Sequence, residues 1–330
     1  MPFENCYHGY GDLLWLAIYF GHCCVNVAAV NAAWNCTGTL GSCSKFNVGT
    51  VHMPYLKRAN QPDIFYALDD YTDPWKNAPY LVLQHGYGRS SRFWYSWVPY
   101  LSRFYKVVRP DVRGLGRSSA EFDLERAFTL DNCMADLAAI IRDLGAQNVH
   151  YCGESMGGIL GIAFAATHPE LLRTLTLVST PARLGNQSYG LGYKSEAEAQ
   201  QAMGMKEWVA ATNKAMRFPE GTDPGLLKWY EDEFSKSRVD VQLVMSKLFH
   251  AIDASVYLPR IEAPVLGLYP SAGPITSPEQ VKLLTTHIRN LRMVHLPATF
   301  HKVQLIYPAA CANHLLHFIA QHDGVACSER

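Results

Sequence analysis

The segment 150-HYCGESMGGILG-161 places a serine between two glycines. Its first residues favour a strand and its last residues favour a helix, so Ser155 stands where a strand turns abruptly into a helix. Such a turn strains the serine backbone and leaves no room for side chains on the neighbours, which accounts for Gly153 and Gly157. The hydroxyl also lies at a helix N-terminus, where developing negative charge is stabilised. The motif G-x-S-x-G in this setting predicts a nucleophilic serine.

A serine hydroxyl becomes a good nucleophile when a base accepts its proton. The segment 295-HLPATFHKVQL-305 follows the last expected strand and offers two histidines. His295 lies within that strand, and we expect it to be a packed core side chain. His301 follows Pro297 in a loop from which the imidazole can reach the serine. We therefore predict His301 as the general base for Ser155.

An oxyanion hole is expected in the loop after a second buried strand, in the segment QHGYGRSSRFW (84–94). We predict that the backbone N–H of Tyr87 and that of Met156 point toward the serine and stabilise the oxyanion. Loss of one such donor lowers the rate about a hundredfold to a thousandfold. We expect His85 to brace its loop rather than to act as a base.

Short apolar runs alternate with helical stretches from residue 53 onward. Apolar runs that are buried on both faces favour a parallel sheet, and their alternation with helices predicts a doubly wound, mostly parallel α/β fold. Strands are expected at 63–70, 80–84, 105–109, 148–152, 172–179, 264–269 and 291–296, and helices at 130–144, 155–168 and 308–321.

A long insertion, residues 181–259, interrupts this alternation. It contains helical patterns around 195–216, 223–236 and 238–251, so we predict a helical cap over the carboxyl edge of the sheet, where ligands of open α/β sheets bind. The α/β core then comprises residues 53–180 and 260–330. The many aromatic and methionine side chains of the cap favour a small, largely apolar substrate, although most of them are expected to pack the cap onto the core.

Together these pieces resemble the α/β-hydrolase superfamily over about residues 54–322. The matching features are His85-Gly86, the segment PDVRGLGRSS (110–119), the GESMGG turn (153–158) and His301. The resemblance is nearest to the capped branch that contains 3-oxoadipate enol-lactonases and related esterases. It implies a serine hydrolase that cleaves an ester, lactone or related acyl bond without a cofactor or a metal, and a structural loop around Asp111 and Arg113.

The acid that this resemblance implies is missing from its usual place. The family carries it after the penultimate strand, where this chain reads YPSAGPITSPEQ (269–280), with Gly273 at the expected aspartate. In serine proteases, removing this acid lowers the rate by about four orders of magnitude. Glu154 and Asp253 are candidate replacements. Four alternatives stay open: a Ser–His dyad acting on an activated ester or lactone, a C–C bond hydrolase, a lyase or decarboxylase on the same scaffold, and a small-molecule receptor with little turnover.

Composition limits the kinds of molecule that the protein is expected to bind. The 330 residues include 29 basic and 29 acidic side chains, so electrostatics favour a small-molecule substrate and give no reason to expect nucleic acid. The spacing of cysteine and histidine does not suit zinc. The sequence fixes neither the substrate nor the oligomeric state.

Residues 1–52 differ from the rest because residues 13–44 carry no charged side chain. The apolar stretch 13–34 is long enough to span a bilayer, although three polar side chains interrupt it. We expect residues 1–52 to lie outside the catalytic fold, as a dispensable extension or an artefact of the assigned start. A membrane anchor and a signal peptide are the alternatives. The expected location is the cytoplasm, or a membrane reached only through residues 13–34.

Overall fold

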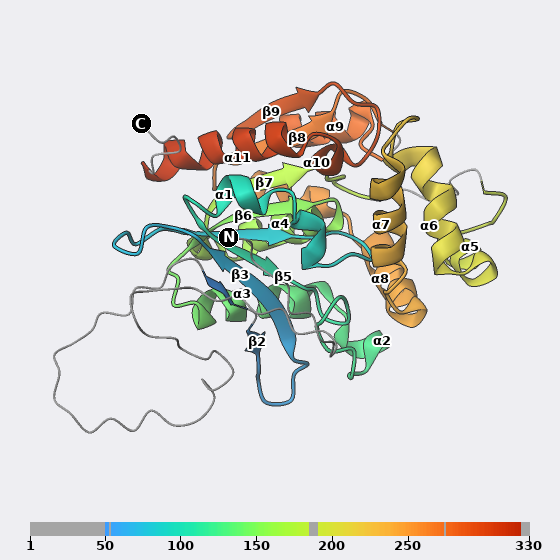
Figure 1. The fold of residues 1–330 in the computed structure, drawn as a ribbon, viewed down its shortest axis with the longest axis horizontal. Coiled ribbons are helices and arrows are strands. Elements are labelled where there is room, and N and C mark those ends of the chain that lie inside the picture. Colours follow the sequence, from blue (N-terminus) through green and yellow to red (C-terminus); the bar gives the residue numbers. More distant parts are fainter. Residues whose placement is uncertain (1–49, 53, 185–190, 274, 325–330) are drawn as a thin grey trace, which may run out of the picture. The chain divides into compact units, whose positions relative to one another are not determined.

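The computed structural model describes residues 50–52, 54–184, 191–273 and 275–324. They form a twisted sheet whose main path runs in the order β1-β3-β5-β4-β6-β7-β8-β9, with β2 paired to β3 (Figure 1). The strands are β1 (Thr50–His52), β2 (Tyr55–Leu56), β3 (Ile64–Asp70), β4 (Tyr80–Gln84), β5 (Lys106–Pro110), β6 (Val149–Glu154), β7 (Leu172–Val178), β8 (Val265–Pro270) and β9 (Leu291–Leu296).

The strands from β5 to β9 run parallel, whereas β3 pairs antiparallel with β1, β2 and β5. This doubly wound, mostly parallel sheet confirms the predicted fold class. Strand β4 lies beside β6 with Gln84 opposite Gly153. The loop that begins at His85 and the turn that holds Ser155 therefore emerge at the same edge of the sheet.

Eleven α-helices are assigned among the described residues. They are α1 (Val98–Leu101), α2 (Leu124–Ala127), α3 (Leu130–Asp143), α4 (Met156–Thr167), α5 (Glu196–Met203), α6 (Met205–Thr212), α7 (Pro224–Phe234), α8 (Val239–Ala251), α9 (Pro278–His287), α10 (Val303–Ile306) and α11 (Pro308–Asp323). The helix predicted at 195–216 is two helices and a π-helical turn (Asn213–Arg217), because Gly204 adopts a φ of 79° and ends α5.

Alternate residues of the strands bury apolar side chains on both faces of the sheet. Tyr151 and Leu175 pack with α3 and α4 on one face. Cys152 and Leu266 pack with α11 and the region of α1 on the other. Strand β9 is the last in the sheet and has a neighbour only on one side among the described residues. His295 on this strand is exposed, so the prediction that it packs in the core was wrong.

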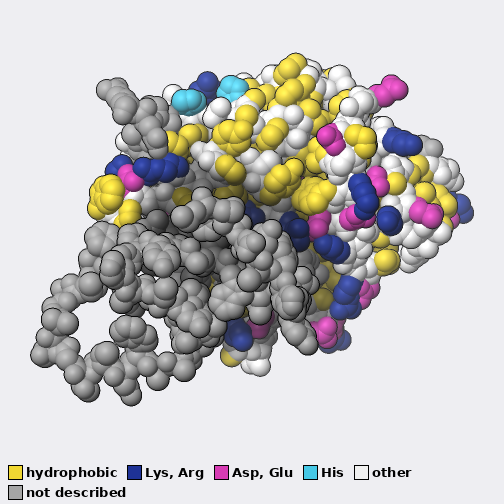
Figure 2. All heavy atoms as spheres, viewed as in Figure 1, with side chains coloured by type: hydrophobic (Ala, Val, Ile, Leu, Met, Phe, Trp, Pro, Cys, Tyr) yellow, Lys and Arg dark blue, Asp and Glu magenta, His cyan; other side chains and the backbone are white. Residues whose placement is uncertain are grey.

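Helices α5–α8 and the π-helical turn, which we call the helical insertion, connect β7 to β8. They lie together at one end of the sheet (Figure 1). Basic and acidic side chains are interspersed on the visible surface of this region (Figure 2). Some of them form ion pairs within one helix, as Lys228 and Asp232 do. On the side seen in this view, the insertion therefore carries charges of both signs.

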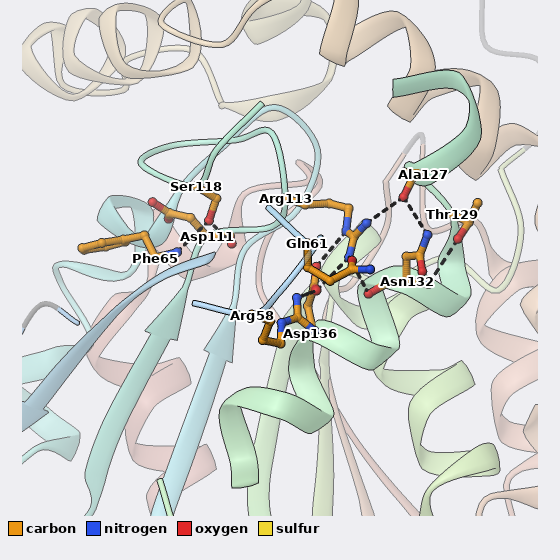
Figure 3. Close-up of polar contacts among 10 residues, drawn as sticks. All are labelled: Arg58, Gln61, Phe65, Asp111, Arg113, Ser118, Ala127, Thr129, Asn132 and Asp136. Carbon is orange, nitrogen blue, oxygen red and sulfur yellow. Dashed lines mark hydrogen bonds and ion pairs between the residues drawn. The ribbon is translucent and has the colours of Figure 1, made fainter. Parts of the chain in front are cut away.

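The loop after β5 is fixed by buried polar contacts (Figure 3). Arg113 is 1% exposed and donates to both carboxylate oxygens of Asp136 on α3 at 2.7 Å, and to the carbonyl of Ala127 at 2.8 Å. Ser118 Oγ donates to the carbonyl of Asp111 at 2.7 Å and accepts from the N–H of Phe65 at 2.9 Å. These bonds tie the loop to α3 and to β3.

The apolar stretch 13–34, and with it the expected membrane contact, lies outside the described residues, as does nearly all of the extension 1–52. Within the described ranges, no helix has both the length and the apolar character to cross a bilayer.

Candidate active site

Ser155 stands in the sharp turn between β6 and α4. Its backbone has a φ of 54° and a ψ of −114°, a conformation that L residues rarely adopt. A Cβ atom on Gly153 would collide with the backbone of Gly157, and one on Gly157 would collide with the carbonyl of Gln84. The two glycines are therefore needed because β4, β6 and α4 approach so closely here. The same turn presents the Ser155 hydroxyl to a cavity.

The structure brings Ser155 and His301 together. The Ser155 hydroxyl lies 3.1 Å from Nε2 of His301, close enough to donate a hydrogen bond to it. The loop that holds the imidazole is fixed by the helical insertion. The N–H of His301 donates to the carbonyl of Met216 at 2.9 Å, and the N–H of Lys302 donates to that of Arg217 at 3.1 Å. The π-helical turn therefore positions the histidine loop.

Tyr87 precedes Ser155 in the chain and Met156 directly follows it, and both residues line the same cavity as the serine. Met156 is the first residue of α4. The Tyr87 hydroxyl donates to the carbonyl of Gln242 on α8 at 3.1 Å. Their backbone N–H groups remain predicted oxyanion donors. His85 is buried, and its Nε2 accepts the N–H of Val112 at 3.1 Å, so this ring connects two loops.

Among the described residues, no carboxylate forms a hydrogen bond with the second nitrogen of the His301 ring. Nδ1 is buried and forms no hydrogen bond with any described residue. Gly273 has room for a Cβ atom, which would lie 3.4 Å from the nearest atom, on Pro270. Asp253, one candidate acid, accepts the N–H of Ser255 at 2.9 Å and pairs with Arg183 at 3.6 Å, and makes no hydrogen bond to His301.

Glu154, the other candidate acid, lies beside His301 but on the wrong side of the ring. Its Oε1 is 3.6 Å from Nε2, the nitrogen that faces Ser155, and 2.7 Å from Nζ of Lys302. Its Oε2 pairs with Arg89. Burial raises the pKa of this carboxyl, but the charges of Arg89 and Lys302 outweigh burial and hold the pKa at about 2. Glu154 is therefore a fixed negative charge next to the imidazole.

His301 is set up to be neutral. Burial lowers the pKa of its imidazole, the charge of Lys302 lowers it further, and Glu154 opposes both, so that the pKa lies well below the usual 6.5. A neutral imidazole whose Nε2 faces a hydroxyl can accept a proton from it.

The cavity above Ser155 has a volume of about 50 Å³ and is lined by both the core and the helical insertion. Trp208, Phe234 and Phe249 supply apolar wall, as the aromatic content of this region predicted. Polar lining was not predicted. It comprises Arg89, Lys302, Glu196, Arg217, Ser246 and His250. Within the described ranges, no three His, Cys, Asp or Glu side chains are grouped so that they could hold a metal ion.

Comparison with known proteins agrees with this geometry. Residues 79–227 match the family described as the alpha/beta hydrolase fold. A strigolactone esterase of Arabidopsis thaliana is 28% identical over 71% of this chain and 90% of its own. A karrikin insensitive 2 receptor of Petunia hybrida is 29% identical over 56% of this chain and 69% of its own. The crystal structure of an enol-lactonase from Burkholderia xenovorans superposes with a TM-score of 0.72, at 25% identity, over 81% of this chain and 100% of that one. The chain belongs to the α/β-hydrolase superfamily.

Proposed function

We propose that this protein is a serine hydrolase that cleaves an ester, a lactone or a related acyl bond of a small molecule. One observation carries the proposal: the Ser155 hydroxyl stands on a strained turn, 3.1 Å from a buried imidazole, and faces a cavity. This arrangement is the one that nucleophilic acyl transfer needs.

In this mechanism, Ser155 Oγ attacks the acyl carbon while Nε2 of His301 takes the hydroxyl proton. The negative charge that forms on the acyl oxygen is held by the N–H groups of Tyr87 and Met156. The intermediate expels the leaving oxygen, to which His301 returns the proton. A water molecule then hydrolyses the acyl-enzyme by the same steps. Glu154, 3.6 Å from Nε2, stabilises the imidazolium through its charge.

The unpartnered Nδ1 of His301 bears on the choice of substrate. A dyad without an orienting acid is a weaker base system, so it is suited to acyl compounds whose leaving group is expelled easily. Enol esters, aryl esters and strained or enolic lactones meet this condition, and alkyl esters and amides do not.

A hydrolysis panel tests the proposal directly. We expect the full chain to turn over 4-nitrophenyl acetate, 4-nitrophenyl butanoate or dihydrocoumarin. Ser155→Ala is expected to reduce the rate by about a thousandfold or more. Thr285→Ala, which removes an exposed hydroxyl on α9, serves as the control and is expected to keep full activity. Equal rates for Ser155→Ala and the wild type would contradict the proposal.

A small-molecule receptor is the second candidate, favoured by the missing partner on Nδ1 and by the similarity to a protein named as a receptor. It predicts that a lactone raises the melting temperature of both wild type and Ser155→Ala, with no product formed by either. Product that depends on Ser155 would argue against it.

A further inference from the structure

More basic than acidic side chains line the cavity. Arg89, Lys302 and Arg217 line it, and the carboxylates that line it or contact its lining residues are Glu154 and Glu196. Arg89 and Lys302 both pair with Glu154, whose two oxygens they share. The bonds of Arg89 are completed by the hydroxyl of Tyr230 at 3.1 Å. Two of the three cations are therefore already held by one anion.

Arg217 has no such anion. It is 5% exposed, and no carboxylate of the described residues lies within 4.0 Å of its guanidinium. Its hydrogen bonds, to the carbonyl of Val209 at 3.2 Å, to Oδ1 of Asn213 at 3.3 Å and to the hydroxyl of Thr212, all use Nη1. Nε and Nη2 donate to no other described residue. Burying a charge without a counter-charge is costly, so a buried arginine at a cavity wall is suited to bind an anion.

The aromatic surroundings hold this guanidinium in place. It lies 5.0 Å from the ring centre of Trp208, 5.3 Å from that of Phe234 and 5.9 Å from that of Tyr230. Cation–π contacts stabilise the charge without using its N–H donors. A planar, preoriented fork with free donors matches a carboxylate, which accepts two parallel hydrogen bonds from arginine.

Glu196 forms no ion pair with Arg217 within 4.0 Å, although the charge of Arg217 acts on it. Its Oε1 accepts from Gln200 at 3.1 Å and its Oε2 lies 3.9 Å from Nε2 of His250. Burial raises the pKa of this carboxyl, against the opposing charges of His250 and Arg217. Its hydrogen bond is thus made with Gln200 on α5 and its only ion-pair contact among the described residues is with His250 on α8, so the Arg217 fork remains available.

We propose that Arg217 determines specificity by binding a carboxylate group of the substrate, so that the preferred substrate is an acyl compound with an anionic end. The inference rests on the proposed hydrolase only for the statement that the anion belongs to a substrate. The backbone of Arg217 also accepts from the N–H of Lys302, next to His301, so the anion would be bound on the same turn that holds the base.

Binding of butanoate and butanamide tests this, because the two probes have nearly the same shape and differ in charge. Both are titrated calorimetrically into full-length Ser155→Ala, which removes turnover. Butanoate is expected to bind at least about tenfold more tightly than butanamide, and Arg217→Met is expected to weaken butanoate about 10- to 100-fold while leaving butanamide unchanged. Arg238→Met, an exposed arginine on the insertion, is the matched control and keeps the preference. Equal affinity for both probes, or a preference that survives Arg217→Met, would overturn the proposal.

A second variant covers the case in which Arg217→Met does not fold. Glu196→Gln removes a negative charge that interacts with the guanidinium, without changing the shape of the side chain. It is expected to strengthen butanoate binding by about 2- to 10-fold, because the negative charge of Glu196 no longer offsets the positive charge of Arg217. Weaker binding contradicts the proposal. If the protein prefers butanoate but hydrolyses no compound of the panel, the anion site is supported and the proposed hydrolase function is refuted. If the panel is hydrolysed but butanoate is not preferred, the hydrolase function is supported and the anion site is refuted.

Discussion

Two hydroxyl–imidazole pairs lie at opposite ends of β6. At the start of β6, His150 places Nδ1 2.9 Å from Thr174 Oγ1 and Nε2 2.8 Å from Asp323, which completes a hydroxyl, an imidazole and a carboxylate. At the end of β6, Ser155 contacts His301, whose other nitrogen has no hydrogen-bond partner in the part of the chain that the structure describes. The three side chains at the start of β6 thus include all the groups of a catalytic triad, yet we assign them no catalytic role.

The surroundings of the two sets explain the assignment. Thr174 lies within β7 and both it and His150 are 0% exposed. Ser155 stands on a turn with a positive φ and faces a cavity next to charged side chains. A complete set of hydrogen bonds stabilises a core, whereas catalysis needs a reacting group that substrate can reach.

Replacing the two histidines should separate these roles most clearly. His301→Gln is expected to lower kcat/KM about a hundredfold to ten-thousandfold, because the base is lost. His150→Gln is expected to leave kcat/KM within about twofold of the wild type and to lower the free energy of unfolding by about 1–3 kcal/mol, because buried hydrogen bonds are lost. Ester kinetics and urea denaturation of both variants measure this. A loss of turnover confined to His150→Gln would reverse the comparison.

Supplying the missing acid should make the two sets more alike. Gly273→Asp places a carboxyl where the family carries one, and a Cβ fits there without a close contact. We expect kcat for 4-nitrophenyl esters to rise about tenfold or more, since an acid behind the ring is worth up to about four orders of magnitude. Gly273→Asn has the same shape without the charge and is the control. A folded Gly273→Asp enzyme that is no faster than the wild type counts against the dyad account.

The pH profile of the reaction should reflect the charges around His301. Only the neutral imidazole is a base, and burial and Lys302 hold its pKa well below 6.5. The rate should therefore stay constant as the pH falls to about 6.5 and decline only below it. Glu154→Gln removes a charge that raises this pKa, so the decline should move to lower pH. Measurement of kcat/KM from about pH 4.5 to pH 8 gives both midpoints; a shift to higher pH in the variant would contradict the role of Glu154.

The free energy of unfolding should also depend on pH through a buried histidine, but this effect should be smaller. Burial lowers the pKa of His150, although Asp323 opposes it, so the folded state resists protonation more than the unfolded chain does. The unfolded state then binds more protons below pH 6.5, and the stabilisation is complete above that pH and declines as the pH falls. We expect His150→Gln to reduce the slope of the unfolding free energy against pH between about pH 5 and pH 6.5, by about 1 kcal/mol over that range. His287→Gln, an exposed residue, should leave the slope unchanged.

The sequence located most of the fold because apolar runs and glycines are local signals. The predicted strand at 80–84 matches β4, and Gly153 and Gly157 mark the turn that holds Ser155. The polar wall of the cavity was missed because its members come from α5, α8, the π-helical turn and two loops, which only the tertiary structure brings together. Glu154 directly precedes Ser155 and Lys302 directly follows His301 in the chain. This adjacency could have been used to predict that both charged side chains lie near the site. The sequence could not show whether Glu154 lies near Nδ1 or near Nε2 of the His301 imidazole.

Labelling of the full chain with a fluorophosphonate probe, mapped by mass spectrometry, tests most directly whether Ser155 is activated without an acid behind His301. We expect a covalent adduct on Ser155, much less of this adduct in His301→Gln, and no adduct on Thr174. A folded wild-type protein that stays unlabelled at Ser155, or that is labelled equally well in His301→Gln, would contradict it.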